Sequence, residues 1–549
     1  MSSGPSSYPS SLRPSPYQLV ALTKLVSSGL HGILICDGVG VGKTIAAGYI
    51  ASYIPGLERR PTLVVSPVML VDKWREELQS KFGIDARPVR NPEELSTAED
   101  ELAYQPNSSS VAYILAQSLL LRQDFETSLR PGLLIADEIH TYRNPNTISY
   151  QVLQRLSKSA KWSVGLTATP INNTLDDLVT ELSLVLPNWN HLSIEAALKE
   201  VWHGRRTSLL SPVLTRFEKE PLKIHFARRS IRTWVVAYPS AYTFSVRMHI
   251  KQKLGKVSST GLRFDEITLH RLATSSPRAF ELATQTSDLL NPSQDPKLAV
   301  LRRILDQSPT SQFIVFCEFV GTVGYLEEAL RDVRRVVPIT GETPFFDRKV
   351  LLDTFRRSAS SVLIMTAVGS EGLDLQSCSR LVNYDLHWNP MILEQRIGRI
   401  DRVGQVKSSV DIENITVAGS IDERVLMVLS KKLAAIAQSV FAPQPILESI
   451  SVGVSAPSES LIVDDAALAA EERRGLELIT ALTESSKIKL DDYNVLSGID
   501  SKFCDPALLR QLSESRQEPP WLSAPPVRAW AGPLRNAARE LTGILSAYS

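Results

Sequence analysis

The sequence is poor in cysteine and has no excess of either charge. Its four cysteines, Cys36, Cys317, Cys378 and Cys504, lie far apart and form no CxxC pair, which argues against a disulfide framework and against a zinc cluster. Lysine and arginine number 60 against 59 aspartates and glutamates. Any nucleic-acid-binding surface must therefore be a local patch.

Long hydrophobic runs are also missing. No uninterrupted apolar segment reaches the roughly 18 residues that a membrane-spanning helix needs, and residues 1–18 contain no apolar stretch like that of a secretory signal. We therefore expect no membrane partner. The scattered cysteines fit a reducing, cytoplasmic location.

The composition is that of a globular protein, with 43% hydrophobic and 22% charged residues. Short β-branched or apolar runs alternate with amphipathic helical stretches, and this rhythm occurs twice. It predicts an α/β fold of two parallel sheets with helices on both faces. The expected strands are 33–36, 62–66, 111–115, 133–137 and 162–167, then 313–318, 336–340, 362–367, 380–385 and 411–417.

The same pattern gives a division into units. We predict a first α/β unit over 1–225, a connector or hinge with a basic helical segment over 226–295, a second α/β unit over 296–445, and a mostly helical or irregular extension over 446–549.

A glycine-rich segment, DGVGVGKT at 37–44, lies between an apolar strand and an alanine-rich helix. Glycines let backbone amides face a phosphate, a lysine supplies positive charge, and a hydroxyl ligates Mg²⁺. The strict pattern expects glycine six residues before Lys43, where Asp37 stands. Such turns also occur as purely structural loops, but the flanking strand and helix favour a phosphate site. The candidate residues are Gly40, Val41, Gly42, Lys43 and Thr44.

An acidic pair follows the apolar run 132–135, in the segment ADEIH. It lies at the carboxyl end of an expected strand, where α/β sheets place their sites. Asp137 is a candidate for the Mg²⁺ that Thr44 also contacts, and Glu138 for orienting the attacking water. The alternative is a surface acidic pair.

Three arginines recur every third residue in EQRIGRIDRVGQ, residues 394–405. Arg396, Arg399 and Arg402 lie close together on an expected helix of the second unit and can neutralise phosphate charge. The alternative is a solvated basic face. With the phosphate loop on one unit and arginines on the other, closure of the two units would follow ATP binding and hydrolysis, as in a motor.

These segments together resemble the ordered motifs of superfamily 2 helicases. The series is YQ (17–18), DGVGVGKT, VVSPVMLVDKWREEL, ADEIH, LTATPINN (166–173), FIVFCEF, VLIMTAVGSEGLDLQ (362–376) and EQRIGRIDRVGQ. The ending RVGQ, the acidic residue at 37 and the PINN after TATP are similar to the SNF2 family of double-stranded-DNA translocases. Residues 269–283 and 381–405 further resemble its bacterial RapA-like branch.

The resemblance covers about residues 12–440 and implies two tandem RecA-like domains flanking an ATP cleft, with ATP and Mg²⁺ bound. It implies that Gln18 reads adenine and that Gly372 and Asp374 lie near the nucleotide. His140, Thr167, Thr169 and Pro170 would couple hydrolysis to domain motion. Gln395, Arg399 and Arg402 match the family's glutamine and arginine fingers, whereas Arg396 matches no finger position.

Nucleic-acid contacts are expected at basic residues near the second strand and the connector. The candidates are Lys73, Arg75, Arg228, Arg229 and Arg232. Trp74 is more typical of a core residue, and exposed arginines on linkers are common. No second histidine or cysteine has ligand spacing to His140, which disfavours a metal role for it.

The sequence therefore predicts an ATP-dependent translocase on double-stranded DNA that remodels protein–DNA complexes, in bacterial transcription, repair or antiphage defence. One alternative is a strand-separating helicase, because DEIH resembles the DEAH box. Another is a nucleotide-gated scaffold subunit of a defence complex. No accessory domain is recognisable, which favours partner protein subunits for targeting.

Overall fold

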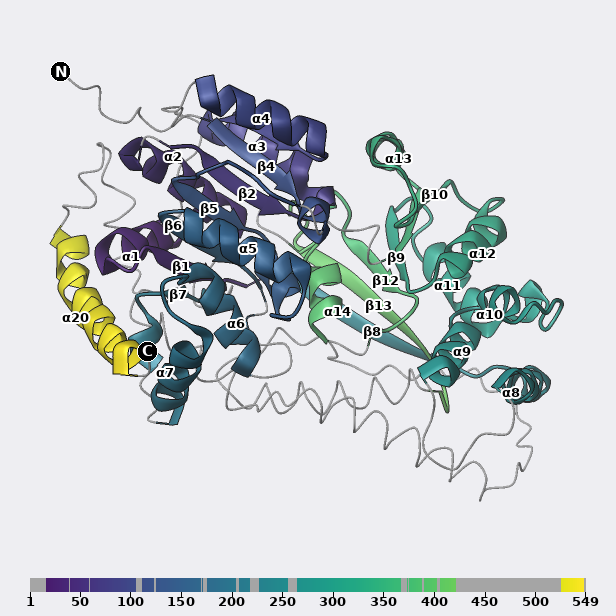
Figure 1. Ribbon diagram of the computed structural model, residues 1–549. Coiled ribbons are helices and arrows are strands. Elements are labelled where there is room, and N and C mark those ends of the chain that lie inside the picture. The colour runs from purple at the N-terminus through teal and green to yellow at the C-terminus, as the bar shows by residue number, and fades with distance from the viewer. Residues whose placement is uncertain are drawn as a thin grey trace. The chain divides into compact units, whose positions relative to one another are not determined.

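The structure is a computed structural model that describes residues 16–420 and 525–547 (Figure 1). Within these ranges it leaves out residues 39, 59, 105–110, 123–124, 169, 171–174, 204–206, 218–226, 255–263, 367–372, 374, 388–389 and 402–404. The chain is divided into two compact units. One consists of Met1–Ile224 together with Lys487–Ser549, and the other of His225–Ser486.

The first unit is built on a seven-stranded sheet in the order β3-β4-β2-β5-β6-β1-β7, with every strand pair parallel. Its strands are β1 Gly32–Ile35, β2 Thr62–Ser66, β3 Asp85–Val89, β4 Val111–Ala116, β5 Leu133–Ala136, β6 Trp162–Leu166 and β7 Leu214–Thr215. The central strands β2, β5 and β6 are buried along their whole length because helices cover both faces of the sheet.

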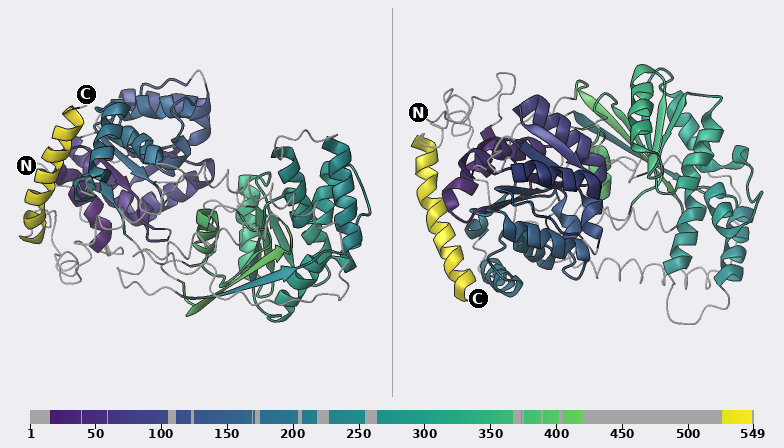
Figure 2. Two further views of the ribbon diagram at one scale, coloured as in Figure 1. Left: turned by 90° about the horizontal axis from the view of Figure 1, so that it is seen from below. Right: turned by 45° about the horizontal axis from the view of Figure 1, so that its top comes forward.

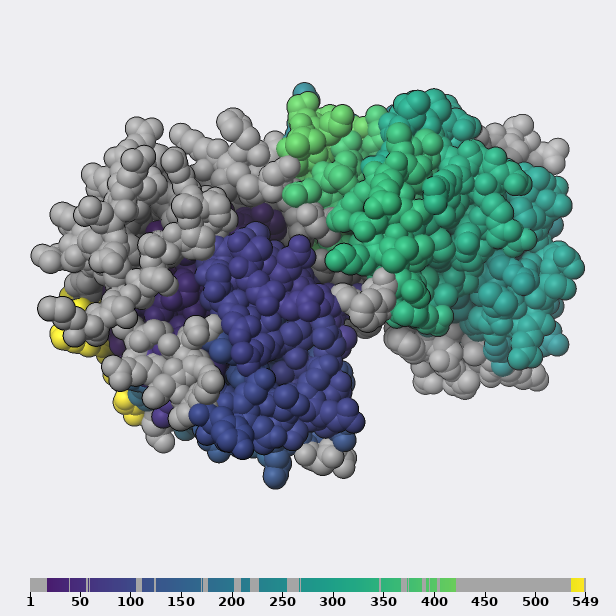
Figure 3. Space-filling model, turned by 90° about the horizontal axis from the view of Figure 1, so that it is seen from above, coloured from purple at the N-terminus to yellow at the C-terminus, as the bar shows by residue number. Residues whose placement is uncertain are grey.

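Alternate residues along the strands pack into two hydrophobic cores, one on each face of this sheet. Leu34 and Leu134 belong to one cluster, and their neighbours Ile33 and Ile135 belong to the other, as the two-residue period of a strand requires. Figure 3 shows one face of the molecule, with described residues of the first unit in purple to blue.

Besides its strands, this unit contains α-helices and 3₁₀ turns. They are η1 Pro16–Leu19, α1 Val20–Ser28, α2 Lys43–Glu58, η2 Val68–Leu70, α3 Val71–Phe82, α4 Pro92–Tyr104, η3 Gln117–Leu121, η4 Ile139–Tyr142, α5 Ile148–Ser159, α6 Leu175–Val185, α7 His191–His203 and η5 Thr207–Leu210.

The C-terminal helix α20, Pro525–Ala547, packs on the first unit against α1, α7 and η5 (Figures 1 and 2). Ala538, Leu541 and Leu545 recur at helical spacing and are buried, so α20 lays an apolar stripe on the core. The predicted extension 446–549 thus ends in a helix that belongs to the first unit, and its residues 446–524 lie outside the described residues.

The second unit has a six-stranded sheet in the order β10-β11-β9-β12-β13-β8, again with every pair parallel. Its strands are β8 Arg228–Val236, β9 Phe313–Cys317, β10 Val336–Ile339, β11 Val362–Thr366, β12 Arg380–Asn383 and β13 Ser409–Val417. Its helices are α8 Ser240–Leu254, α9 Phe264–Ser275, α10 Pro277–Thr284, η6 Pro292–Gln294, α11 Pro296–Asp306, α12 Val320–Leu330, α13 Phe345–Arg357 and α14 Pro390–Ile397.

The segment 226–295 is organised differently from the predicted connector. Its first part forms β8, which pairs with β13 over its whole length, and Tyr242 of α8 and Phe280 of α10 are buried in a core cluster with Val417 of β13. The sequence pattern did not predict this strand because β8 contains several arginines, although its Ile231 and Trp234 are buried. The segment is therefore part of the second unit.

The predicted α/β fold with two parallel sheets is confirmed. Each of the ten expected strands is present with ends within two residues of the prediction. Among the described residues, no helix is long and apolar enough to cross a bilayer.

Candidate nucleotide-binding site

The phosphate loop connects β1 to α2, as the sequence indicates. Gly40 and Gly42 have φ of 81° and 102°, a backbone conformation that glycine adopts without strain. A Cβ at Gly42 would lie 3.0 Å from Gln18 Nε2, so a larger residue would also press on that amide. Val41 is buried, and its carbonyl accepts a hydrogen bond of 2.6 Å from Tyr17 Oη.

Lys43, the first residue of α2, is folded back onto the loop. Its Nζ donates to the carbonyl oxygens of Asp37 at 2.9 Å and Gly38 at 3.3 Å. Burial lowers the pKa of Lys43, and the nearby carboxylates of Glu138, Asp37 and Asp137 oppose that shift. The ammonium is thus held among loop carbonyls, where an incoming phosphate can replace them as its partner.

Asp37 stands where the strict loop pattern has glycine, and the structure gives a physical reason. Its side chain is buried, and Oδ1 accepts hydrogen bonds from Thr215 Oγ1 at 3.2 Å and from the Phe217 amide at 3.1 Å. The aspartate therefore ties the start of the loop to the edge strand β7, a function that glycine cannot perform.

Asp137 follows β5 and is held by two hydrogen bonds. Its Oδ2 accepts from Trp74 Nε1 at 2.7 Å, and its Oδ1 accepts from the Glu138 amide at 3.0 Å. Burial, and then the charge of Glu138, raise the pKa of Asp137 to about 6 against the effect of the Trp74 hydrogen bond. A buried acid of this kind is stabilised as a carboxylate when a cation binds beside it.

Glu138 has a left-handed backbone with φ of 48°, which is uncommon for a residue with a side chain and is found at functional sites. Its Oε2 is buried and lies 3.3 Å from His140 Nδ1. The same His140 nitrogen lies 3.3 Å from Thr167 Oγ1. Burial lowers the pKa of His140, so the neutral imidazole connects the acidic pair to the segment after β6.

The donor set suits magnesium better than a transition metal. No group of three or more histidine, cysteine, aspartate or glutamate side chains with metal-site geometry occurs among the described residues. Mg²⁺ needs only one or two carboxylates when phosphate oxygens supply further ligands. Asp137 and the Thr44 hydroxyl fit that requirement.

Three more of the predicted residues belong to the first unit. Pro170 is buried, and Gln18 lies over the phosphate loop in η1. Thr169 lies outside the described residues. Their proposed roles in coupling and in reading adenine stay predictions.

In the second unit, α14 carries Gln395 and Arg396, and Arg399 lies in the turn after it. The Arg399 amide donates to the Arg396 carbonyl at 3.1 Å. Arg402, Gly372 and Asp374 lie outside the described residues. The finger roles of Gln395, Arg399 and Arg402 stay predictions.

The expected nucleic-acid contacts need one correction. Arg229 is buried, and its Nη2 lies 2.7 Å from Asp401 Oδ2, with both side chains at most 4% exposed, so it is a structural ion pair and cannot reach a phosphate. Arg232 is 41% exposed and contacts Glu413 at 2.9 Å. Lys73, Arg75 and Arg228 remain candidates, with side-chain exposures of 28% and 47% for the first two.

Sequence reasoning missed two residues that organise the site. Trp74 is 1% exposed and was assigned to the core, which is confirmed, but its hydrogen bond to Asp137 was not foreseen. A buried indole N–H needs an acceptor, so the prediction that Trp74 is buried already implied a polar partner for it. Arg216 donates to the carbonyls of Cys36 at 2.7 Å and Ala168 at 3.2 Å, and nothing in its local sequence marks it.

Comparisons with known proteins match both units. A family profile described as the SNF2-related domain matches residues 17–193, and one described as the helicase conserved C-terminal domain matches residues 296–404. An ATP-dependent helicase of Bacillus subtilis (strain 168), YqhH, is 29% identical over 477 residues, which cover 81% of this chain and 83% of that protein.

Two further relatives are much longer than this chain. The SWI/SNF-related matrix-associated actin-dependent regulator of chromatin subfamily A-like protein 1 of Xenopus tropicalis is 27% identical, covering 74% of this chain and 43% of that protein. The RNA polymerase-associated protein RapA of Serratia proteamaculans (strain 568) is 25% identical, covering 71% of this chain and 46% of that protein. This chain thus spans less than half the length of either.

Among solved structures, a Sulfolobus solfataricus SWI2/SNF2 ATPase core in complex with double-stranded DNA aligns at 17% identity with a TM-score of 0.37. The alignment covers 82% of this chain and 99% of that one. A superposition of that closeness assigns no function.

Proposed function

Because this chain belongs to the SNF2 family of superfamily 2 ATPases and has RapA-like relatives, we propose that it couples ATP hydrolysis to movement along double-stranded DNA. The movement would remodel protein–DNA complexes. One relative is RNA polymerase-associated and another is a SWI/SNF-related regulator of chromatin. These names support a substrate made of protein and DNA. We propose a role in bacterial transcription, repair or antiphage defence.

One observation carries the ATPase part of the proposal. The phosphate loop and the acidic pair, which are far apart in sequence, come together in the first unit: Glu138, Asp37 and Asp137 all act on the charge of Lys43. Lys43 is partly buried, and removing its charge from water is costly without a function or full pairing. Its position therefore supports a functional role.

In the proposed reaction, Lys43 leaves its loop carbonyls for the β and γ phosphates of ATP. Thr44 and Asp137 would hold Mg²⁺, which neutralises phosphate charge. Glu138 orients the attacking water and accepts its proton, and His140, 3.3 Å from Glu138 Oε2, keeps that carboxylate in place. Gln395, Arg399 and Arg402 would supply the second unit's share of the site.

DNA stimulation of hydrolysis tests this proposal. ATP turnover by the purified full chain is measured with and without duplex DNA over a range of salt concentrations, since phosphate contacts make binding salt-sensitive. We expect stimulation that falls as salt rises. Equal rates with and without DNA contradict the proposal.

One variant and one assay on the unmodified chain separate the alternatives. Glu138→Gln keeps the size of the side chain but removes the proton acceptor, so a motor loses its activity on DNA, whereas a nucleotide-gated scaffold that needs only ATP binding keeps its function. A fluorescent strand-displacement assay on the unmodified chain detects a strand-separating helicase. Unwinding without a triplex-displacement signal would favour that helicase over the translocase.

Targeting by partner protein subunits is also part of the proposal. Co-purification of the full chain from its native cells, with and without nuclease treatment, distinguishes protein partners from proteins held only by shared DNA. A partner that persists after nuclease treatment supports this part.

A further inference from the structure

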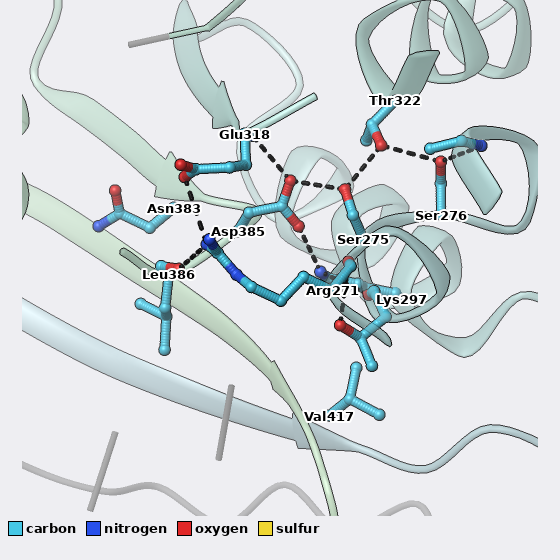
Figure 4. Close-up of polar contacts among 12 residues, drawn as sticks. Arg271, Ser275, Ser276, Lys297, Glu318, Thr322, Asn383, Asp385, Leu386 and Val417 are labelled. Atoms are coloured by element: carbon cyan, nitrogen blue, oxygen red, sulfur yellow. Dashed lines mark hydrogen bonds and ion pairs between the residues drawn. The ribbon is translucent and has the colours of Figure 1, made fainter. Parts of the chain in front are cut away.

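Glu318, the residue after β9, lies between two arginines from different helices. Its Oε2 is 3.3 Å from Arg396 Nη2 of α14 and 3.7 Å from Arg271 Nη2 of α9. Figure 4 shows Arg271 reaching from α9 to this carboxylate and to the Leu386 carbonyl. Both distances to the carboxylate exceed those of a short charge-assisted hydrogen bond, and His387 Nε2 lies 3.8 Å from its other oxygen, Oε1. Glu318 Oε2 is therefore shared between the two arginines.

Arg396 depends on that carboxylate because it is almost completely enclosed. Its side chain is 2% exposed, and its Nε has no hydrogen-bond partner among the described residues. Its Nη1 donates to the Asp385 carbonyl at 2.7 Å. A buried guanidinium needs a counter-charge, and Glu318 supplies one at 3.3 Å.

A second contact joins the same two helices through Asp385. Its side chain accepts hydrogen bonds from Ser275 Oγ at 2.7 Å, the Glu318 amide at 2.9 Å and Lys297 Nζ at 2.7 Å (Figure 4). Ser275 and Arg271 are four residues apart and so lie on one face of α9. Asp385 therefore binds α9 through its side chain and α14 through its carbonyl.

The hydroxyls of Ser275, Ser276 and Thr322 complete this connection. Thr322 Oγ1 lies 2.6 Å from Ser275 Oγ and 2.9 Å from Ser276 Oγ, and all three residues are buried. The end of α9, the start of α10 and the start of α12 are thus fixed to the ends of β9 and β12. Such a network holds one arrangement well because an unmade buried hydrogen bond is costly.

We propose that Arg271 and Glu318 are positioning residues of the ATPase, which set the place of α14 and thereby of Gln395 and Arg399. Neither touches the nucleotide in this account. Without Arg271, the Glu318 carboxylate moves toward Arg396 and α14 shifts with it. This inference rests on the proposed role of α14 in hydrolysis.

The experiment compares ATP turnover by full-length Arg271→Gln, Arg271→Lys, Glu318→Gln and the double variant Arg271→Gln/Glu318→Gln. The matched control is Arg278→Gln, because Arg278 lies on α10, is 54% exposed and forms an ion pair with Glu281 at 3.7 Å on its own helix. Thermal melting of each variant checks its folding.

We expect kcat to fall about 10- to 100-fold in Arg271→Gln with KM changed less than about twofold, because misplaced catalytic groups affect turnover more than binding. Arg271→Lys restores part of the loss because it keeps the charge. The double variant is no slower than Glu318→Gln, since both changes break one contact. Arg278→Gln retains the unmodified rate.

Arg399→Ala is measured in parallel so that the two proposals fail separately. If Arg399→Ala loses turnover while folded Arg271→Gln keeps it, the positioning role is wrong and the proposed function stands. If Arg399→Ala keeps full turnover, the role of α14 in hydrolysis is wrong. Additive losses in the double variant, or equal losses in Arg278→Gln, also overturn the positioning role.

Discussion

The hydrogen bond from Trp74 to Asp137 offers a sharp test of how the proposed Mg²⁺-binding carboxylate is held. Trp74→Phe removes the indole N–H and keeps an aromatic ring in a site where the side chain is 1% exposed. The lost contact is the 2.7 Å bond to Asp137 Oδ2. The second contact of this carboxylate, from the Glu138 amide to Oδ1, remains.

The size of the effect follows from the chemistry of that bond. A hydrogen bond to a charged group contributes about 1.5 to 3 kcal/mol, and about 1.4 kcal/mol corresponds to a tenfold change in rate. Partners that orient a metal-holding residue typically affect activity by about 10- to 100-fold. We therefore predict a 10- to 100-fold lower kcat/KM for ATP in Trp74→Phe, by the same relation.

Trp162→Phe is the matched control. Trp162 is also buried, and its Nε1 donates to a carboxylate, Glu58 Oε1, at 2.8 Å, but it begins β6 and so lies at the opposite end of the strands from the site. ATP turnover and thermal melting are measured for both variants. Equal turnover in the two folded variants would refute the reasoning about Asp137.

Three further predictions concern stability, each measured by urea denaturation followed by circular dichroism. Lys297→Met leaves Asp385 buried without its ammonium partner at 2.7 Å, and should cost about 3 to 5 kcal/mol. Leu541→Ala removes a 3% exposed side chain by which α20 packs on the first unit, and should cost about 2 to 5 kcal/mol, whereas Arg539→Ala on the exposed face should change little. Burial alone would raise the pKa of Asp385, but Lys297 and hydrogen bonds hold it below its ordinary 3.8. This stabilisation is therefore present above that pH and lost as the pH falls through the folded-state pKa. Asp385→Asn should flatten this acid dependence, and an unchanged slope would contradict it.

Several of the strands that the sequence predicts are apolar throughout. β1 and β9 are buried on both faces, so a simple apolar run marks them. β3 was missed because it contains Pro88 and lies at the sheet edge, where proline is tolerated. β8 was missed because its arginines find acidic partners only in the folded chain, as Arg229 does with Asp401.

The parts of the candidate site that could be predicted are those whose geometry depends on the spacing of residues close together in the sequence. The glycines of the phosphate loop and the placement of Asp137 after β5 follow from sequence order. The bond from Trp74 joins residues 63 positions apart, and Glu318 meets Arg396 across 78 positions. Contacts of this kind depend on the strand order of each sheet, which no local pattern encodes.

Movement along duplex DNA is the central claim, and displacement of a third strand from a triplex tests it most directly. The full chain is mixed with duplex DNA that carries a fluorescent triplex-forming strand, with ATP, and Glu138→Gln serves as the hydrolysis-deficient control. The account predicts ATP-dependent release of the third strand while the duplex stays paired, and no release by the variant. Rapid ATP hydrolysis on that DNA without any release of the third strand would contradict it.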